Sequence, residues 1–140
     1  GLVMGEAVIF FNKALAADFP YVRKQSTQLY SKMRYIAAQF CAYLEEGLWL
    51  RLAAHANRMA ALLCRRLQEI PEIRVTRPCE ANALFLIMPE ELKAQLRERY
   101  FFYDWDETTG EARLMTSFDT TEADVENFIG YIREILNRRS

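Results

Sequence analysis

Residues 110–129 read GEARLMTSFDTTEADVENFI and join the pattern of a strand to the pattern of a helix. In the first half, apolar and polar positions alternate, which is typical of a strand with one buried face. We therefore expect Arg113 to project from a sheet, on the face opposite the buried one. The face expected to be buried carries Ala112, Leu114, Thr116 and Phe118.

The second half of this stretch predicts a helix packed beside that strand. Asp119, Thr120 and Thr121 offer side-chain oxygens that can cap the first turn of a helix. The apolar residues that follow have helical spacing and predict one buried stripe. They are Val125, Phe128, Ile129, Ile132, Ile135 and Leu136.

Arg113 has two interpretations at this point. The planar guanidinium on a stiff strand is suited to bidentate binding of a carboxylate, which fixes orientation as well as charge. Alternatively, Arg113 forms a local ion pair with Glu111 or Asp119, as surface arginines commonly do. The pattern of the stretch alone leaves both interpretations open.

Composition limits the function classes that fit. The chain has 140 residues, enough for one domain with a substantial core, and a net charge of −1 without a dense basic run. We therefore expect neither a nucleic acid nor a membrane as a partner. With His55 as the one histidine and no paired cysteines, we expect no metal site. The three widely spaced cysteines indicate a reducing, cytoplasmic location.

The N-terminal half predicts strands followed by long helices. Residues 1–12 are apolar and rich in β-forming residues, so we expect one or two strands there. An apolar strand needs neighbours, and the next strand pattern lies about sixty residues away, so we expect its sheet to lie upstream of Gly1. Helices are expected over 21–45 and 48–67, with Gly47 as the break between them.

The C-terminal half predicts a small α+β unit. Strands are expected over 73–77, 82–88 and 100–105, and a helix over 89–99. The strand at 100–105 should form a hairpin with the Arg113 strand. The predicted fold class is therefore α+β, with two long helices followed by a small, mostly antiparallel sheet that has helices on one face. The other face of the sheet, which carries Arg113, remains available to contact a ligand or another protein surface.

Several segments in this order resemble one enzyme family. They are GLVMGEAVIFF at the start, YVRKQSTQLYSKMRYIAAQFCAYLEEGLWLRLAAHANRMA, EANALF, FYDW and the closing RLMTSFDTTEADVENFI. Together they resemble the C-terminal part of the low-specificity L-threonine aldolases and their β-eliminating-lyase relatives, which are pyridoxal-phosphate enzymes of fold type I. The resemblance implies that residues 1–19 end a large cofactor-binding domain, 20–69 form connecting helices, and 70–140 form the small domain.

The resemblance also implies an activity and roles for individual residues. Such enzymes cleave threonine-like β-hydroxy-α-amino acids into glycine and an aldehyde, and they act as homo-dimers or homo-tetramers. Arg113 matches the arginine that binds the substrate carboxylate, and Lys24 and Arg34 match residues near the cofactor, in the same or a neighbouring subunit. The lysine that carries pyridoxal 5'-phosphate in the family would precede Gly1, so this chain alone should be inactive and holds no catalytic residue.

Two other hypotheses stay open. One is a non-catalytic α+β module that binds a carboxylate through Arg113 or mediates oligomerisation, which would require Gly1 to be a true start. The other is a different enzyme of fold type I, such as an aminotransferase or a cysteine desulfurase, against which the FYDW and SKMR segments argue.

Overall fold

The computed structural model describes residues 2–138, and the chain divides into two compact units. The first unit ends at Trp49 and the second begins at Leu50. Gly1, where the predicted first strand begins, lies outside the described residues, as do Arg139 and Ser140. The predicted domains 1–19, 20–69 and 70–140 refer to a longer protein and stay a prediction.

The first unit is helical. Its elements are η1 (Lys13–Ala16), α1 (Phe19–Gln25), α2 (Met33–Leu44) and η2 (Glu45–Gly47). The predicted strand at the start is wrong for residues 2–12, which form no strand. A strand is defined by its hydrogen-bonded neighbour, and in the described chain no other segment pairs with this one. Its apolar side chains stay in solvent, with Val3 97% and Phe11 98% exposed.

The predicted single helix over 21–45 is also wrong, because residues 26–32 separate α1 from α2. Ser26 and Thr27 follow α1 directly, and their side chains compete with helical hydrogen bonding. Thr27 has a positive φ of 58°, and its N–H donates to the Lys24 carbonyl in a turn that closes α1. The apolar spacing on which the prediction rested becomes regular only further along the chain.

The predicted break at Gly47 is confirmed. Glu46 and Gly47 have φ angles of 49° and 69°, a left-handed backbone that ends a helix. The next helix, α3, runs from Leu48 to Gln68 and thus begins two residues before the unit boundary.

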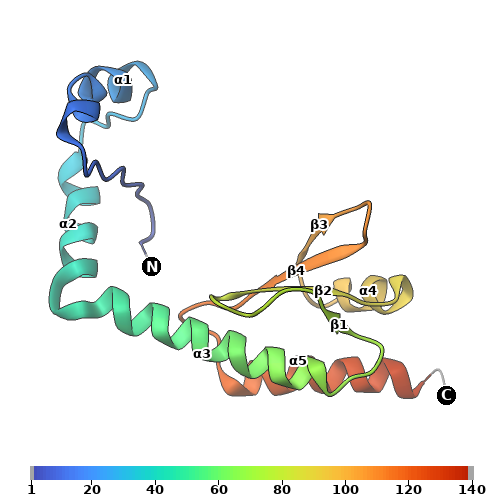
Figure 1. Cartoon of the computed structure of the whole chain (residues 1–140). Helices are drawn as coiled ribbons and strands as arrows, with labels where there is room; N and C mark the ends of the chain where they lie inside the picture. The colour runs from blue at the N-terminus through green and yellow to red at the C-terminus, as the bar shows by residue number, and fades with distance from the viewer. Residues whose placement is uncertain (1, 139–140) are drawn as a thin grey trace. The chain divides into compact units, whose positions relative to one another are not determined.

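The second unit contains a four-stranded antiparallel sheet, as predicted (Figure 1). The strands are β1 (Arg74–Val75), β2 (Ala83–Ile87), β3 (Tyr103–Asp106) and β4 (Glu111–Met115). The strand order is β1-β2-β4-β3, so β4 lies between β2 and the edge strand β3. The remaining helices are α4 (Glu90–Arg97) and α5 (Glu122–Asn137).

One hydrophobic core joins a single face of this sheet to α3, α4 and α5. The alternating residues Leu84 and Leu86 of β2 and Ala112 and Leu114 of β4 are all buried in it. Burial of each large side chain contributes about 1.5 to 3 kcal/mol. The helical contribution comes from Leu63, Leu67, Leu92, Leu96, Val125, Ile129, Ile132 and Ile135. This arrangement confirms the predicted fold class, including the stripe on the last helix.

The segment after β4 departs from the predicted pattern. The strand ends at Met115, and Phe118, expected on the buried face, is 49% exposed. The Ser117 N–H donates to the Thr120 hydroxyl at 2.8 Å, which turns the chain before α5. Thr121 then caps α5 in a reciprocal capping box with Asp124. Hydrogen bonds from Thr121 hold the pKa of Asp124 below its ordinary value.

A group of ion pairs around the buried Lys93 amine attaches β3 to α4. The Lys93 amine is almost fully buried and donates to Glu90 at 2.7 Å and to the Gly110 carbonyl at 3.1 Å. Asp104 lies 3.2 Å from the Lys93 amine and 2.5 Å from the Arg97 guanidinium. Burial acts to lower the pKa of Lys93, but hydrogen bonds with Glu90 and Asp104 raise it above its ordinary value. The hydrogen bond from Arg97 lowers the pKa of Asp104.

We predict that Asp104→Asn destabilises this chain by about 1 to 2 kcal/mol at pH 7, because the buried Lys93 loses an anionic partner. The folded pKa of Asp104 lies below 3.8, so its charge stabilises the fold above pH 3.8 and the contribution is lost as the pH falls through the folded pKa. Urea unfolding at several pH values should therefore show the difference from wild type shrinking in acid.

The exposed carboxylate Asp119 supplies a control, since Asp119→Asn should change stability by less than about 0.5 kcal/mol at any of these pH values. A difference between wild type and Asp104→Asn that stays constant down to pH 2 would contradict the assignment.

Candidate carboxylate-binding site

Arg113 lies on β4, in the interior of the sheet, on the face opposite the one that packs against α3, α4 and α5. It is aligned with Phe85 on β2 and with Tyr103 on β3. Its neighbours Ala112 and Leu114 are buried in the core on the opposite face. The alternation of β4 therefore places the Arg113 side chain where the sequence predicted it.

Aromatic rings surround the Arg113 guanidinium. Its central carbon lies 4.8 Å from the ring centroid of Trp105 and 5.5 Å from that of Tyr103. Trp105 in turn meets Phe85 edge to face, with ring centroids 5.2 Å apart. These distances are in the range of cation–π contacts, which hold a guanidinium near a ring without using its N–H groups.

The local ion pair proposed as an alternative for Arg113 is not formed. Glu111 instead binds Arg77 at 2.6 Å and accepts a hydrogen bond from the Thr76 hydroxyl. Arg113 has no ion pair with any residue between 2 and 138, Asp119 included. Its Nε atom is buried and has no hydrogen-bond partner among residues 2–138. An unpaired buried donor is costly, so an acceptor that reached this guanidinium would be bound favourably.

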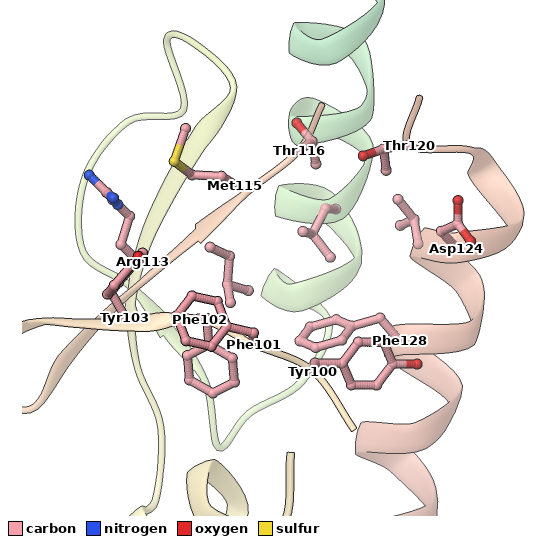
Figure 2. A pocket seen from close by; sticks show the side chains of 13 residues that line it. Tyr100, Phe101, Phe102, Tyr103, Arg113, Met115, Thr116, Thr120, Asp124 and Phe128 are labelled. Atoms are coloured by element: carbon pink, nitrogen blue, oxygen red, sulfur yellow. The ribbon is translucent and has the colours of Figure 1, made fainter. Parts of the chain in front are cut away.

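A mostly apolar pocket of about 280 Å³ adjoins Arg113 (Figure 2). Arg113, Tyr103 and Met115 lie on one side of it, and Asp124 and Phe128 lie on the other. The pocket forms where the chain before Tyr103 leaves β4, because strand pairing stops at the Tyr103–Arg113 pair. In Figure 2 the guanidinium nitrogens of Arg113 point away from Phe128, so the stem of Arg113 borders the pocket while its charge faces outward.

Lys24 and Arg34, predicted to bind the cofactor, lie in the first unit. Lys24 is in α1 and Arg34 in α2, and both are exposed. Arg113 belongs to the other unit. Their roles stay a prediction.

Arg23, beside Lys24, is a polar residue that the sequence did not single out. It lines a cavity of about 840 Å³ within the first unit, and its Nε atom is buried without a partner among residues 2–138. The basic group of this helix was visible in the sequence, but helical spacing over seven residues could not show which member faces inward.

His55 makes a structural contact with the segment that follows β4. Its Nε2 lies 2.7 Å from the Thr120 carbonyl, so the ring donates a hydrogen bond to that oxygen. The Thr116 hydroxyl donates to the Ala56 carbonyl at 2.8 Å. These two bonds attach α3 to the segment between β4 and α5.

The comparisons with solved structures define the class of fold. The chain matches threonine aldolase from Leishmania major with a TM-score of 0.78 and 29% identity, over 90% of this chain and 37% of that one. It also matches a glycine decarboxylase (P-protein) with a TM-score of 0.60 at 22% identity and a NifS-like protein with 0.51 at 20%, which show the fold alone. The α+β fold predicted for the C-terminal part of a fold type I enzyme is confirmed.

The comparisons with curated proteins point to one family within that class. The chain is 43% identical over 137 residues to the low-specificity L-threonine aldolase of Pseudomonas sp. (strain NCIMB 10558) and 42% identical over 135 residues to that of Pseudomonas aeruginosa. No family model matches the chain. The predicted resemblance to the low-specificity L-threonine aldolases is confirmed, and the chain spans about 40% of the length of these relatives.

We predict that double-mutant cycles in urea unfolding will distinguish Arg113 from Arg77, which lies on the same face of the sheet. Glu111→Gln combined with Arg77→Met should give a coupling free energy of about 1 kcal/mol, because these side chains form an ion pair. Glu111→Gln combined with Arg113→Met should be additive to within about 0.5 kcal/mol. A larger coupling to Arg113 than to Arg77 would mean that Glu111 neutralises Arg113 in solution.

Proposed function

We propose that this chain is part of a longer pyridoxal-phosphate-dependent aldolase that cleaves threonine-like β-hydroxy-α-amino acids into glycine and an aldehyde. In this proposal Arg113 binds the α-carboxylate of the substrate. The observation that carries it is the unpaired guanidinium of Arg113 on the open face of the sheet. Similarity to aldolases at 42 to 43% identity over nearly the whole chain supports the reaction class.

Arg113 contributes orientation to this reaction. Pyridoxal phosphate, when bound, supplies a ring that accepts the electrons released when a bond at the α-carbon breaks. Two parallel hydrogen bonds from one guanidinium hold a carboxylate in a fixed plane. Fixing the carboxylate limits rotation about the α-carbon, so the same bond is presented to the cofactor in each turnover. Arg113 thus serves to select the Cα–Cβ bond for cleavage.

The residues of this chain fit substrate binding better than cofactor attachment. An attachment lysine must lose its proton to react, whereas the Lys93 amine is buried in ion pairs that raise its pKa. Lys13, Lys24 and Lys32 do not stand in the Gly-Gly-Thr-Lys-Asn-Gly type of motif that the family uses. We infer that the attachment lysine lies in another part of the longer protein. Lys24 and Arg34 are exposed cations that can supply charge to the cofactor phosphate.

The proposal also covers the partners, the oligomeric state and the location of the enzyme. A large cofactor-binding domain and a second or further copy of the protein are its expected partners, in a homo-dimer or homo-tetramer. A cytoplasmic location suits the three free cysteines, which a reducing compartment keeps unpaired. Among residues 2–138, none of the helices combines the length and the apolar character needed to cross a bilayer.

Arg113 is also consistent with the alternative, a carboxylate-binding module without catalysis. An unpaired arginine binds carboxylates whether or not a reaction follows. Glycine release from threonine by the longer protein, the positive control of the first experiment below, separates the aldolase from this alternative.

The first prediction concerns the chain by itself. Purified as the 140-residue chain and mixed with pyridoxal phosphate, it should show neither the absorbance of a lysine-bound cofactor nor release of glycine from threonine. The physical reason is that its lysines are misplaced or ion-paired. Difference spectra and a glycine assay measure the two outcomes, with the longer protein as the positive control. Turnover by the chain alone would contradict the missing-lysine argument.

The second prediction concerns Arg113 in the longer protein. Arg113→Ala should weaken amino-acid binding by about 2 to 4 kcal/mol, because the carboxylate loses a charged bidentate partner. Cofactor content, read from the absorbance of the purified protein, should stay unchanged. Arg77→Ala is the matched control, since Arg77 lies on the same face but is already paired with Glu111. Loss of cofactor with unchanged amino-acid affinity would show that Arg113 has a different role.

A further inference from the structure

We propose that Trp105 and Tyr103, which together we call the aromatic shelf, are positioning residues that hold the guanidinium of Arg113 for carboxylate binding. This inference rests on the proposed function of Arg113 and adds two residues to it. The aromatic shelf lies on β3, directly beside β4, with Tyr103 aligned to Arg113 in the strand register. Trp105 and Tyr103 approach the guanidinium carbon of Arg113 to 4.8 Å and 5.5 Å from their ring centroids.

The choice of aromatic partners has a chemical consequence. A carboxylate partner would neutralise Arg113 and occupy the N–H groups that a ligand must use. A ring face attracts the cation through its quadrupole and leaves those N–H groups free. The aromatic shelf therefore restrains the long arginine side chain, which would otherwise lose rotamer entropy when a ligand binds.

Arg77 provides a comparison on the same face of the sheet. Its guanidinium also lies over a ring, 4.3 Å from the centroid of Phe85. Arg77 differs because Glu111, with its side chain 8% exposed, already binds it at 2.6 Å. Of these two arginines, Arg113 alone keeps its charge unpaired, so the ring contacts of Arg113 are suited to a ligand site and those of Arg77 to a structural ion pair.

Contacts on the opposite face of β3 and from β2 hold the aromatic shelf in place. Asp104 lies between its two residues in the sequence and projects to the other face, where it binds Lys93 and Arg97 of α4. Phe85 of β2 packs edge to face against Trp105 from the neighbouring side. The strand that carries the aromatic shelf is thus anchored by ion pairs, although Trp105 and Tyr103 themselves are 47% and 56% exposed.

NMR of this chain tests the positioning without any cofactor or activity. In the wild type, the Arg113 Nε–H resonance should be shifted by the ring current of Trp105 and should exchange slowly, because Nε is buried. Trp105→Leu should move the resonance to the position typical of exposed arginines, and Trp105→Phe should retain most of the shift. Phe118→Leu is the matched control, since Phe118 is 49% exposed and is not among the residues that line the pocket beside Arg113.

Glycine binding in the longer protein supplies the second measurement. Trp105→Leu should weaken glycine binding about 3- to 10-fold, while Trp105→Phe and Phe118→Leu should stay within about 2-fold of the wild type. Tyr103→Leu, a second variant at an exposed position, should weaken binding in the same direction, which keeps the test available if Trp105→Leu folds poorly.

The outcomes separate the two proposals. An unshifted Arg113 resonance in the wild type, or an unchanged resonance and glycine affinity in both Trp105→Leu and Tyr103→Leu, would overturn the role of the aromatic shelf. Absence of glycine binding in every protein, the wild type included, would instead contradict the proposed function of Arg113, and the resonance shifts would still decide whether the aromatic shelf positions it.

Discussion

The alternation of β4 is the constraint on which the rest of the second unit depends. Ala112 and Leu114 must enter the core, because the sheet has apolar side chains from α3, α4 and α5 on that face alone. A strand turns successive side chains to opposite faces, so burial of these two residues forces Arg113 outward. A shift of the register by one residue would place the Arg113 guanidinium in the core. Burying that charge would cost free energy, so the shifted register is strongly disfavoured.

On this face, ion pairing uses Arg77 but leaves Arg113 available. Glu111 forms an ion pair with Arg77 and accepts a hydrogen bond from Thr76. On the opposite face, Asp104 forms ion pairs with Lys93 and Arg97. Both carboxylates are close to Arg113 in the strand register, yet neither pairs with it. The result is a cation held beside two aromatic rings of β3, on a sheet whose other face packs in the core, which is the preorganisation that carboxylate recognition requires.

Much of the second unit could be predicted from the sequence because local pattern and tertiary packing agree there. The alternation at Arg113 and the helical stripe from Val125 onward both describe surfaces that are buried within this chain. The first unit lacks that agreement. Among its described residues the one buried apolar side chain is Ile36, so its apolar sequence pattern does not correspond to a buried core. The predicted strand at 2–12 failed for this reason, and the helix at 21–45 failed because Ser26 and Thr27 end α1. Trp105 and Tyr103 were missed as site residues because their contact with Arg113 depends on strand register, which composition does not reveal.

The central claim is that Arg113 binds the carboxylate of an amino acid. A crystal structure of the longer protein with glycine or threonine bound tests it most directly. The account predicts both carboxylate oxygens within about 2.7 to 3.2 Å of Arg113 nitrogens, with the guanidinium still beside Trp105. A bound amino acid whose carboxylate is held by other groups, with Arg113 in water or paired to a protein carboxylate, would contradict it.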